Sequence, residues 1–271
     1  MKFGKKVEID KVKSLSGKSR IYDVIPVELL LKIILNGNEI LTLSCSPQNL
    51  IELTIGFLLN NGYIENYSEI NLIHICKNEL KDKKNGPILV SSIMIKTSKI
   101  DSDKAINNTI GKKIIYSSCG SIDDFIFDKK LKKIKSNIRI SSEIILNLNL
   151  SVLHHQKYKK ELGGLHSAAL FDKNGKILCL MEDIGRHNCI DKIAGYMAIY
   201  KIEFLDKIIF TTGRLSIDVI YKVCRMAVPA IVTNSSITHS AILLAKKVNL
   251  TAIGYARSGR FNIYSCPQRV I

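Results

Sequence analysis

Four arginines stand beside glycines in short polar stretches, and each stretch follows an apolar run. They are Arg186, Arg214, Arg257 and Arg260, half of the eight arginines among the 40 basic residues of the chain. A guanidinium group binds phosphate through two parallel hydrogen bonds, a geometry that a lysine ammonium group lacks. The neighbouring glycines allow a ligand to approach the backbone closely. The pattern therefore predicts a site for a ligand that carries phosphate groups.

The longest of these stretches runs from residue 182 to residue 192 and reads Glu-Asp-Ile-Gly-Arg-His-Asn-Cys-Ile-Asp-Lys. It follows the apolar run 177–181 and precedes apolar residues at the i, i+3, i+4, i+7 spacing of a helix. With Asn188 as the N-cap, Gly185, Arg186 and His187 would lie in the turn, beside backbone N–H groups that attract anions. Taken alone, the stretch also fits a loop that these charges merely solvate.

Thiol chemistry is suggested by Cys119, which lies in the polar run Ser117-Ser118-Cys119-Gly120-Ser121. Cys179 and Cys224 lie in apolar runs instead. A reactive thiolate needs access and a nearby positive charge that lowers its pKa, and Lys112 and Lys113 are close in sequence. A spectator cysteine in a loop fits the same pattern, so both interpretations stay open.

Alternating strands and helices are expected to hold the arginine stretches in place. We expect strands at 165–171, 177–181, 208–212, 230–232, 251–254 and 261–264, and helices capped by Ser142, Asn188, Ser216 and Thr238. This order predicts a mostly parallel sheet covered on both faces, with ligands beyond the carboxyl ends of the strands. The turns at 185–187, 213–216, 233–238 and 255–260 should therefore converge. His166 would stand at the mouth of the sheet, in a structural or a proton-handling role.

The first half of the chain predicts a smaller α+β portion. It contains strands at 27–35 and 40–44 around the hairpin signal Asn36-Gly37, a helix from Ser46-Pro47 to Gly62, and strands at 70–76 and 88–95. A long polar loop is expected at 97–118. We therefore divide the chain into a loose basic arm (1–20), an α+β portion with the Cys119 loop (21–135) and an α/β domain (136–271).

Composition limits the classes of protein to which this chain can belong. With 271 residues, 46% of them apolar, it is long enough for one large core or two unequal ones. No run reaches the ~18 apolar residues of a membrane span and no signal peptide opens the chain, so we expect a cytoplasmic protein without a membrane partner. Seven scattered cysteines fit neither a disulfide framework nor a Cys-x-x-Cys metal site.

The formal charge of +16 alone would suit nucleic acid. Lysine supplies most of it in surface-like runs, and no basic-aromatic stacking motif or helix-turn-helix signature accompanies it, so we expect no nucleic-acid partner. Neither Gly-x-x-x-x-Gly-Lys-Ser/Thr nor Gly-x-Gly-x-x-Gly occurs, which argues against a P-loop NTPase and an ordinary dinucleotide oxidoreductase.

Several motifs, taken in order, resemble those of the FdhD family of sulfur carriers required for formate dehydrogenase activity. They are Gly163-Gly164-Leu165-His166-Ser167-Ala168-Ala169-Leu170, Glu182-Asp183-Ile184-Gly185-Arg186-His187-Asn188, Gly213-Arg214-Leu215-Ser216 and Gly254-Tyr255-Ala256-Arg257-Ser258-Gly259-Arg260-Phe261-Asn262, with a further match at 47–61. The resemblance covers nearly the whole chain.

The resemblance implies a homodimeric sulfurtransferase whose C-terminal domain has the three-layer α/β/α fold of cytidine deaminases. Cys119 would receive persulfide sulfur from a cysteine desulfurase and pass it to the molybdenum or tungsten bis(molybdopterin guanine dinucleotide) cofactor, which then enters formate dehydrogenase. Tyr255, Ala256, Arg257, Ser258, Gly259 and Arg260 would contact this cofactor, with Arg186 and Arg214 as further phosphate partners. His166 and His187 would complete the site as candidates for proton handling.

Two departures qualify this resemblance. Family members often carry Cys-Gly-x-Cys-Gly where this chain has Cys119-Gly120-Ser121-Ile122, so a second loop thiol is absent. The deaminase zinc signature is also absent, since no Glu stands two residues after His166 and no Pro-Cys-x-x-Cys occurs, and we expect no zinc. The alternative function is a chaperone that delivers the cofactor without sulfur transfer.

Overall fold

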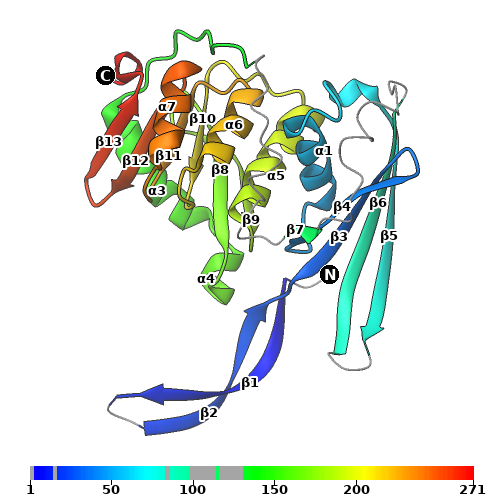
Figure 1. Ribbon diagram of the computed structural model, residues 1–271. Helices are drawn as coiled ribbons and strands as arrows, with labels where there is room; N and C mark the ends of the chain where they lie inside the picture. Colours follow the sequence, from blue (N-terminus) through cyan, green and yellow to red (C-terminus); the bar gives the residue numbers. More distant parts are fainter. Residues whose placement is uncertain (1–2, 15–16, 83–85, 98–113, 116–130) are drawn as a thin grey trace.

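The structure is a computed structural model that describes residues 3–14, 17–82, 86–97, 114–115 and 131–271. For residues 77–82, 86–89 and 114–115 it describes the backbone alone. The described strands form a two-stranded arm, a five-stranded sheet and a six-stranded sheet. Figure 1 shows the five-stranded and six-stranded sheets side by side, with the arm extending away from both.

The six-stranded sheet is mixed, whereas the sequence predicted a mostly parallel one. Its order is β13-β12-β11-β10-β8-β9, and only the pairs β10/β11 and β11/β12 are parallel. The pairs β8/β9 and β12/β13 are antiparallel because turns of a few residues join their strands, and a short turn can only reverse the chain. The strands are β8 (His166–Asp172), β9 (Ile177–Asp183), β10 (Lys207–Thr211), β11 (Ala230–Thr233), β12 (Thr251–Arg257) and β13 (Arg260–Ser265).

The predicted convergence of the arginine turns survives this correction. Because β8 is antiparallel to both β10 and β9, β9 runs in the same direction as β10, β11 and β12. The carboxyl ends of these four strands therefore lie at one edge, together with the first residues of β8 and β13. We call this edge of the sheet the site edge.

Helices cover both faces of the six-stranded sheet, which confirms the three-layer α/β/α fold. On one face, α5 (Arg186–Ile199), α6 (Ile217–Arg225) and α7 (His239–Lys247) bury Ile190, Ile220 and Leu244 against strand residues such as Ile209. On the other face, α3 (Ser142–His155) buries Leu148 with Phe210. The short helix α4 (Tyr158–Leu162) follows α3. No helix in the described ranges is long and apolar enough to cross a membrane.

The N-terminal sheet has the order β5-β6-β3-β4-β7, and its strand pairs match the hairpins predicted from the sequence. Every second residue of β3 is buried, and α1 covers this face with Leu53 and Leu58. The elements are β3 (Leu29–Leu35), β4 (Asn38–Cys45), α1 (Leu50–Asn60), the 3-10 helix η1 (Tyr67–Glu69), β5 (Ile70–Asp82), β6 (Gly86–Thr97) and β7 (Ile114–Ile115).

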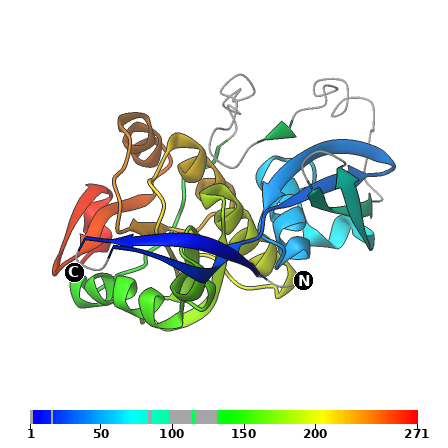
Figure 2. The ribbon, with the colours of Figure 1, turned by 90° about the horizontal axis from the view of Figure 1, so that it is seen from below.

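Helices α1 and α5 cross at two glycines, which joins the two larger sheets through one helix pair. A Cβ atom on Gly56 would lie 1.7 Å from the Asp191 carbonyl oxygen, and one on Gly195 would lie 1.9 Å from the Glu52 carbonyl oxygen. The helix backbones are therefore in direct contact. In Figures 1 and 2, α1 accordingly lies between the N-terminal sheet and α5.

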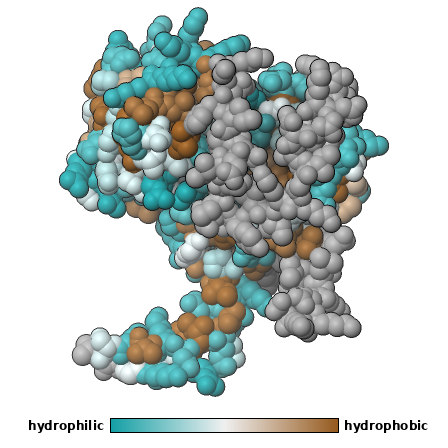
Figure 3. All heavy atoms as spheres, in the orientation of Figure 1, coloured by the Kyte–Doolittle hydropathy of each residue, from teal (hydrophilic) through white to brown (hydrophobic). Residues whose placement is uncertain are grey.

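The first residues form a hairpin, so the prediction of a loose arm over residues 1–20 was wrong. β1 (Gly4–Lys13) pairs with β2 (Gly17–Pro26), and the predicted boundary at residue 20 falls inside β2. Alternating apolar residues place Ile9 opposite Ile21, a cross-strand pair that the polar composition concealed. At the base of the arm, Phe3 stacks on Tyr158 with the ring centroids 3.9 Å apart. Figure 3 shows brown, apolar patches along the exposed arm.

The predicted boundary between residues 135 and 136 falls within a segment that packs on the six-stranded sheet. The Ile134 amide donates to the Val248 carbonyl oxygen at 2.8 Å, and the Ile134 side chain is buried in the core beside α7. Residues 131–135 therefore pack with the C-terminal part of the chain.

Candidate functional site

Helix α5 begins at Arg186, three residues earlier than predicted. Gly185 is the N-cap, and its amide donates to Asp183 Oδ1 at 2.8 Å. Asn188 is therefore not the cap. Its side chain points inward and donates to Asp183 Oδ1 at 2.8 Å and to the Ser44 carbonyl oxygen at 2.9 Å. Because the helix begins at Arg186, Arg186 and His187 lie in its first turn, and no side chain accepts a capping hydrogen bond there.

The acidic residues of the 182–192 stretch serve the fold. Asp183 is fully buried and pairs at 2.6 Å with Lys192, which is also fully buried. Its Oδ2 accepts a hydrogen bond from the Ser46 amide at 3.1 Å, which ties the N-terminal portion to the start of α5. Glu182 accepts hydrogen bonds from the amides of Lys157, Tyr158 and Lys159. A buried charge is tolerated only when it is paired in this way.

A second buried ion pair ties the same helix to its neighbours. Lys222 of α6 pairs with Asp191 of α5, and the other Asp191 oxygen accepts a hydrogen bond from the Asn60 side chain of α1 at 2.8 Å. Helix α5 is thus held by α6 on one side and by α1 on the other. This anchoring fixes the position of its first turn.

Arg186 reaches from the end of β9 towards the turn after β10. A Cβ atom on Gly213 would lie 2.9 Å from Arg186 Cβ, so this glycine leaves the space in which the arginine packs. Arg186 Nε is buried and has no hydrogen-bond partner among the residues that the structure describes. The group is therefore ready to donate to a ligand.

His166 lies within electrostatic range of the first turn of α5. It is the first residue of β8 and pairs in register with Asp183. Burial lowers the pKa of His166, and the positive charges of Lys159, Arg186 and His187 lower it further. The predicted residues Arg186, His187 and His166 are thus brought together near one end of the site edge, where they form a cluster of basic side chains with Lys159.

His187 contacts the N-terminus of α6. Its Nε2 lies 3.3 Å from Asp218 Oδ2 and 3.5 Å from Ser216 Oγ. The hydrogen bond with His187 lowers the pKa of Asp218, against the opposing effect of burial. Asp218 is therefore a carboxylate that directly contacts a predicted site residue.

The turn between β12 and β13 lies at the other end of the site edge. Arg257 and Arg260 face each other across it, and both side chains are exposed. Tyr255, Ser258 and Gly259 have positive φ angles of 54°, 53° and 73°, which bend the strand end sharply. The Ala256 side chain is fully buried in the core, so only its backbone is able to meet a ligand.

Backbone contacts join the middle turns to both ends. The Tyr255 amide donates to the Ser235 carbonyl oxygen at 2.9 Å, and Thr233 Oγ1 donates to the Gly213 carbonyl oxygen at 2.8 Å. Arg214 is exposed between these turns. From β9 to β12 the edge spans four strand spacings, or about 19 Å. One phosphate cannot reach both ends, whereas an extended ligand with several phosphates can.

The sequence model of the FdhD/NarQ family matches residues 26–271 of the chain. The chain belongs to the FdhD/NarQ family. The Sulfur carrier protein FdhD of Bacillus subtilis is 35% identical over 255 residues, which cover 93% of this chain and 92% of that protein. The protein of the same name from Staphylococcus aureus strain MRSA252 is 34% identical over 254 residues, or 90% and 88% of the two chains.

A solved structure supports the fold. The chain resembles the crystal structure of a candidate formate dehydrogenase accessory protein from Desulfotalea psychrophila, with a TM-score of 0.76, 22% identity and complete coverage of both chains. The family predicted from the motifs is confirmed by these comparisons. The family match begins at Pro26, the last residue of β2, so the rest of the arm lies outside the match.

Cys119 lies outside the residues that the structure describes, together with Lys112, Lys113 and Ile122. Its role as the sulfur-carrying residue stays a prediction. Of the described cysteines, Cys179 and Cys189 have pKa values raised by burial, to about 12 for Cys179. A thiol with such a pKa is protonated at neutral pH and is a poor nucleophile.

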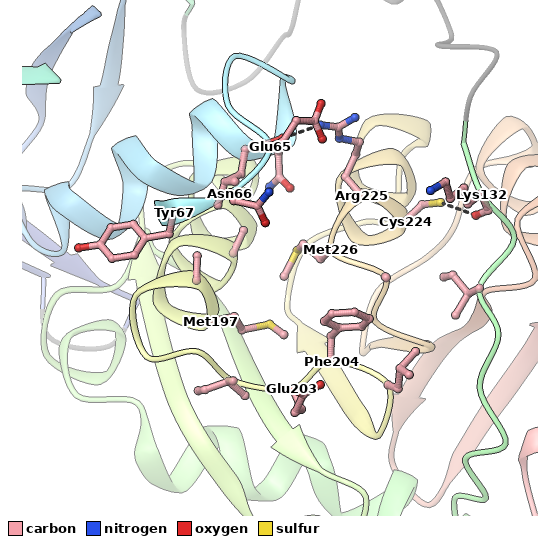
Figure 4. A pocket seen from close by; sticks show the side chains of 18 of the residues that line it. Glu65, Asn66, Tyr67, Lys132, Met197, Glu203, Phe204, Cys224, Arg225 and Met226 are labelled. Carbon is pink, nitrogen blue, oxygen red and sulfur yellow. Dashed lines mark hydrogen bonds between the residues drawn. The ribbon is translucent and has the colours of Figure 1, made fainter. Parts of the chain in front are cut away.

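A groove of about 1530 Å³ lies at the other end of α5, near the amino ends of β10 and β11 (Figure 4). Met197, Phe204 and Met226 line it, and Glu65 and Arg225 stand near its rim. Arg225 Nη2 donates to the Leu59 carbonyl oxygen at 3.1 Å. None of the described residues predicted for the site lines this groove, so the groove is separate from the described part of the site edge.

Sequence reasoning missed Lys159 of the cluster and Asp218, which contacts His187. Asp218 follows Ser216 by two residues, so its place at the start of a helix that faces the site edge was a usable signal. Lys159 gave no signal, because it is one of many lysines on a basic chain.

Proposed function

We propose that this protein receives sulfur on Cys119 from a cysteine desulfurase and passes it to the molybdenum or tungsten bis(molybdopterin guanine dinucleotide) cofactor. The cofactor, bound as a substrate at the site edge, would then serve formate dehydrogenase. The relatives named Sulfur carrier protein FdhD support the sulfur chemistry. The name of the Desulfotalea psychrophila protein supports the link to formate dehydrogenase.

The observation that carries the proposal is Arg186 Nε, which has no hydrogen-bond partner among the described residues and lies in a cluster of basic side chains. Leaving a buried N–H group without a partner costs about 1–3 kcal/mol, which a ligand phosphate would recover. His166 has a lowered pKa and is thus mainly neutral at pH 7, so it is able to take up a proton when an anion arrives. These features suit a phosphate ligand.

The length of the site edge favours a dinucleotide over a single phosphate. Arg186 packs on Gly213, which follows β10, whereas Arg257 and Arg260 follow β12, two strand spacings or about 10 Å away along the sheet. A cofactor with two guanine dinucleotides carries two pyrophosphates, which separate arginine groups are able to bind. Arg214 directly follows Gly213.

One cysteine is sufficient for the sulfur step. The Cys119 thiolate would attack the outer sulfur of the donor persulfide, and the donor thiolate would leave. Delivery of that outer sulfur to the acceptor returns Cys119 as a thiolate. The absence of a second loop cysteine, at Ile122, is therefore compatible with this cycle.

The test of the sulfur step is the mass of the intact chain after incubation with a cysteine desulfurase and cysteine. The wild type should gain one sulfur atom, and Cys119→Ala should gain none. Cys266→Ala is the matched control, because Cys266 is partly buried with a raised pKa and should not carry the sulfur. A gain that persists in Cys119→Ala would overturn the assignment of the carrier residue.

The test of the site edge is stabilisation by guanosine diphosphate. The nucleotide should raise the melting temperature of the wild type and of Arg20→Ala, an arginine variant in the arm, and should fail to do so in Arg257→Ala. An equal shift in all three proteins would place the nucleotide elsewhere.

A chaperone that delivers the cofactor without sulfur transfer is the second candidate. The single cysteine of the loop favours it, because family members often carry two there. Binding of guanosine diphosphate without any gain of sulfur would select this function.

A further inference from the structure

The carboxylate of Asp218 contacts His187 in a place that should favour anions. His187 acts on the His166 ring together with the cationic Arg186 and Lys159, so these basic groups lie near one another. On the helix that carries Asp218, Lys222 adds a further positive charge. A negative charge at such a place weakens anion binding by simple Coulomb repulsion. The Asp218 carboxylate should therefore have a role that outweighs this loss of anion affinity.

The geometry of the pair indicates that role. His187 Nε2 lies 3.3 Å from Asp218 Oδ2, and the two side chains are 17% and 24% exposed. An ionised carboxylate only accepts hydrogen bonds, so the proton of the neutral ring is held on Nε2. Nδ1 is then the ring nitrogen left for a ligand, and it donates to a phosphate oxygen once the bound anion favours uptake of a second proton by the ring.

Ser216 completes the support from α6. Its Oγ lies 3.5 Å from the same Nε2 atom, and Ser216 is the N-cap of the helix that carries Asp218. The His187 backbone is fixed by its place in the first turn of α5, which the buried Asp183–Lys192 pair anchors. Both the backbone and one ring nitrogen of His187 are thus constrained.

We infer that Asp218 is a positioning residue, which fixes the tautomer and ring orientation of His187 so that Nδ1 faces the phosphate-bearing ligand of the site edge. Only the nature of the ligand rests on the proposed function. The structure of the pair does not depend on it.

A purely structural role makes a different prediction. Asp218 lies in the first turn of α6, where a negative charge stabilises a helix through its dipole. That effect does not require His187. A double-mutant cycle therefore separates the two roles, because a positioning effect must vanish when the histidine is removed.

The first experiment measures guanosine diphosphate affinity by calorimetry in wild type, Asp218→Asn, His187→Ala and the double variant. Positioning predicts that Asp218→Asn weakens binding about five- to tenfold in the wild type and leaves it unchanged in the His187→Ala background. Removal of a negative charge alone would strengthen binding instead. Stronger binding, or an equal loss in both backgrounds, would overturn the inference.

The charge-matched control is Glu203→Gln, which removes one negative charge at the distant groove. It should leave nucleotide affinity unchanged. If Glu203→Gln weakens binding as much as Asp218→Asn does, the effect is a general one of net charge and the positioning role is rejected.

The second experiment needs no ligand. At a pH at which the His187 ring is neutral, nitrogen NMR should show its proton on Nε2 in the wild type and a mixture of tautomers in Asp218→Asn, because an amide can turn either its oxygen or its NH₂ group to the ring. An unchanged tautomer would overturn the inference. If the wild type does not bind the nucleotide, the proposed cofactor edge fails, while this measurement still decides the role of Asp218.

Discussion

Gly56 of α1 and Gly195 of α5 lie against each other so closely that a Cβ atom on Gly56 would be 2.8 Å from the Gly195 amide nitrogen. This contact brings the N-terminal sheet to the helix whose first turn carries Arg186 and His187. The backbone atoms at the crossing cannot move aside as a flexible side chain would. The packing of the two portions therefore depends on the absence of two side chains.

Gly56→Ala should destabilise the protein by about 3 kcal/mol, the upper end of the usual cost of overpacking. Intrinsic helix propensity alone predicts the opposite sign, a gain of about 1 kcal/mol for replacing glycine within a helix. Urea unfolding measures the difference. A variant as stable as the wild type would show that α1 and α5 can separate at little cost.

Lys192→Met should cost about 3–5 kcal/mol, because it leaves the fully buried Asp183 without its partner. Adding Asp183→Asn to this variant should restore part of the loss, since the uncompensated charge is then removed. Lys201→Met, at an exposed position, is the control and should change stability by less than about 0.5 kcal/mol. Equal losses in the single and double variants would contradict the ion-pair explanation.

Arg186→Met should have opposite effects on stability and on ligand binding. Without ligand it should stabilise the protein by about 1 kcal/mol, because it removes an unpaired buried N–H group while an unbranched side chain still packs on Gly213. It should weaken guanosine diphosphate binding about tenfold to a hundredfold. Arg186→Lys keeps the charge without the planar fork, so a full retention of affinity in that variant would argue against bidentate binding.

His166 should make stability depend on pH in the weakly acidic range. Burial and the neighbouring positive charges lower the pKa of His166 below its ordinary value of 6.5, so the unfolded chain takes up the proton first as pH falls. Its contribution to stability is complete above pH 6.5 and is lost as pH falls through the folded pKa. Urea unfolding at several pH values should show this decline in the wild type and in the exposed control His239→Gln, and a smaller decline in His166→Gln.

An anion at the site edge should reverse that shift. Guanosine diphosphate should raise the pKa of His166, since a nearby negative charge favours the protonated ring. NMR titration of the ring with and without the nucleotide measures the change. A pKa that stays the same or falls on binding would place the phosphates away from His166.

Local spacing in the sequence was sufficient to predict most helices and strands and to predict which residues gather at the site edge. Ser216 and Thr238 were recognised as helix caps because capping depends on residues within one turn. The arginine–glycine turns converge as expected, since the direction of each strand at the site edge follows from the order of strands and helices. The motifs likewise identified the family.

Other features depended on residues that are distant in sequence. Asn188 is not the N-cap, because its side chain donates inward to Asp183 and to the Ser44 carbonyl oxygen. The mixed sheet and the hairpin arm depended on strand pairing, in which β-branched residues find partners across a turn. A mostly polar composition does not indicate which residues of β1 and β2 pair across the hairpin.

The sequence by itself thus determined which residue types are available for chemistry, the repeated strands and helices that carry them, and the family. Only the tertiary structure decided that Asp183 faces inward, that Asp218 meets His187 across 31 positions of the chain, and that Arg186 Nε finds no partner within the described part of the chain. The physical reason is the distance along the chain over which each interaction acts. Periodicity and capping act within a few residues, whereas burial, charge pairing and close helix contact are settled when separate segments pack against one another.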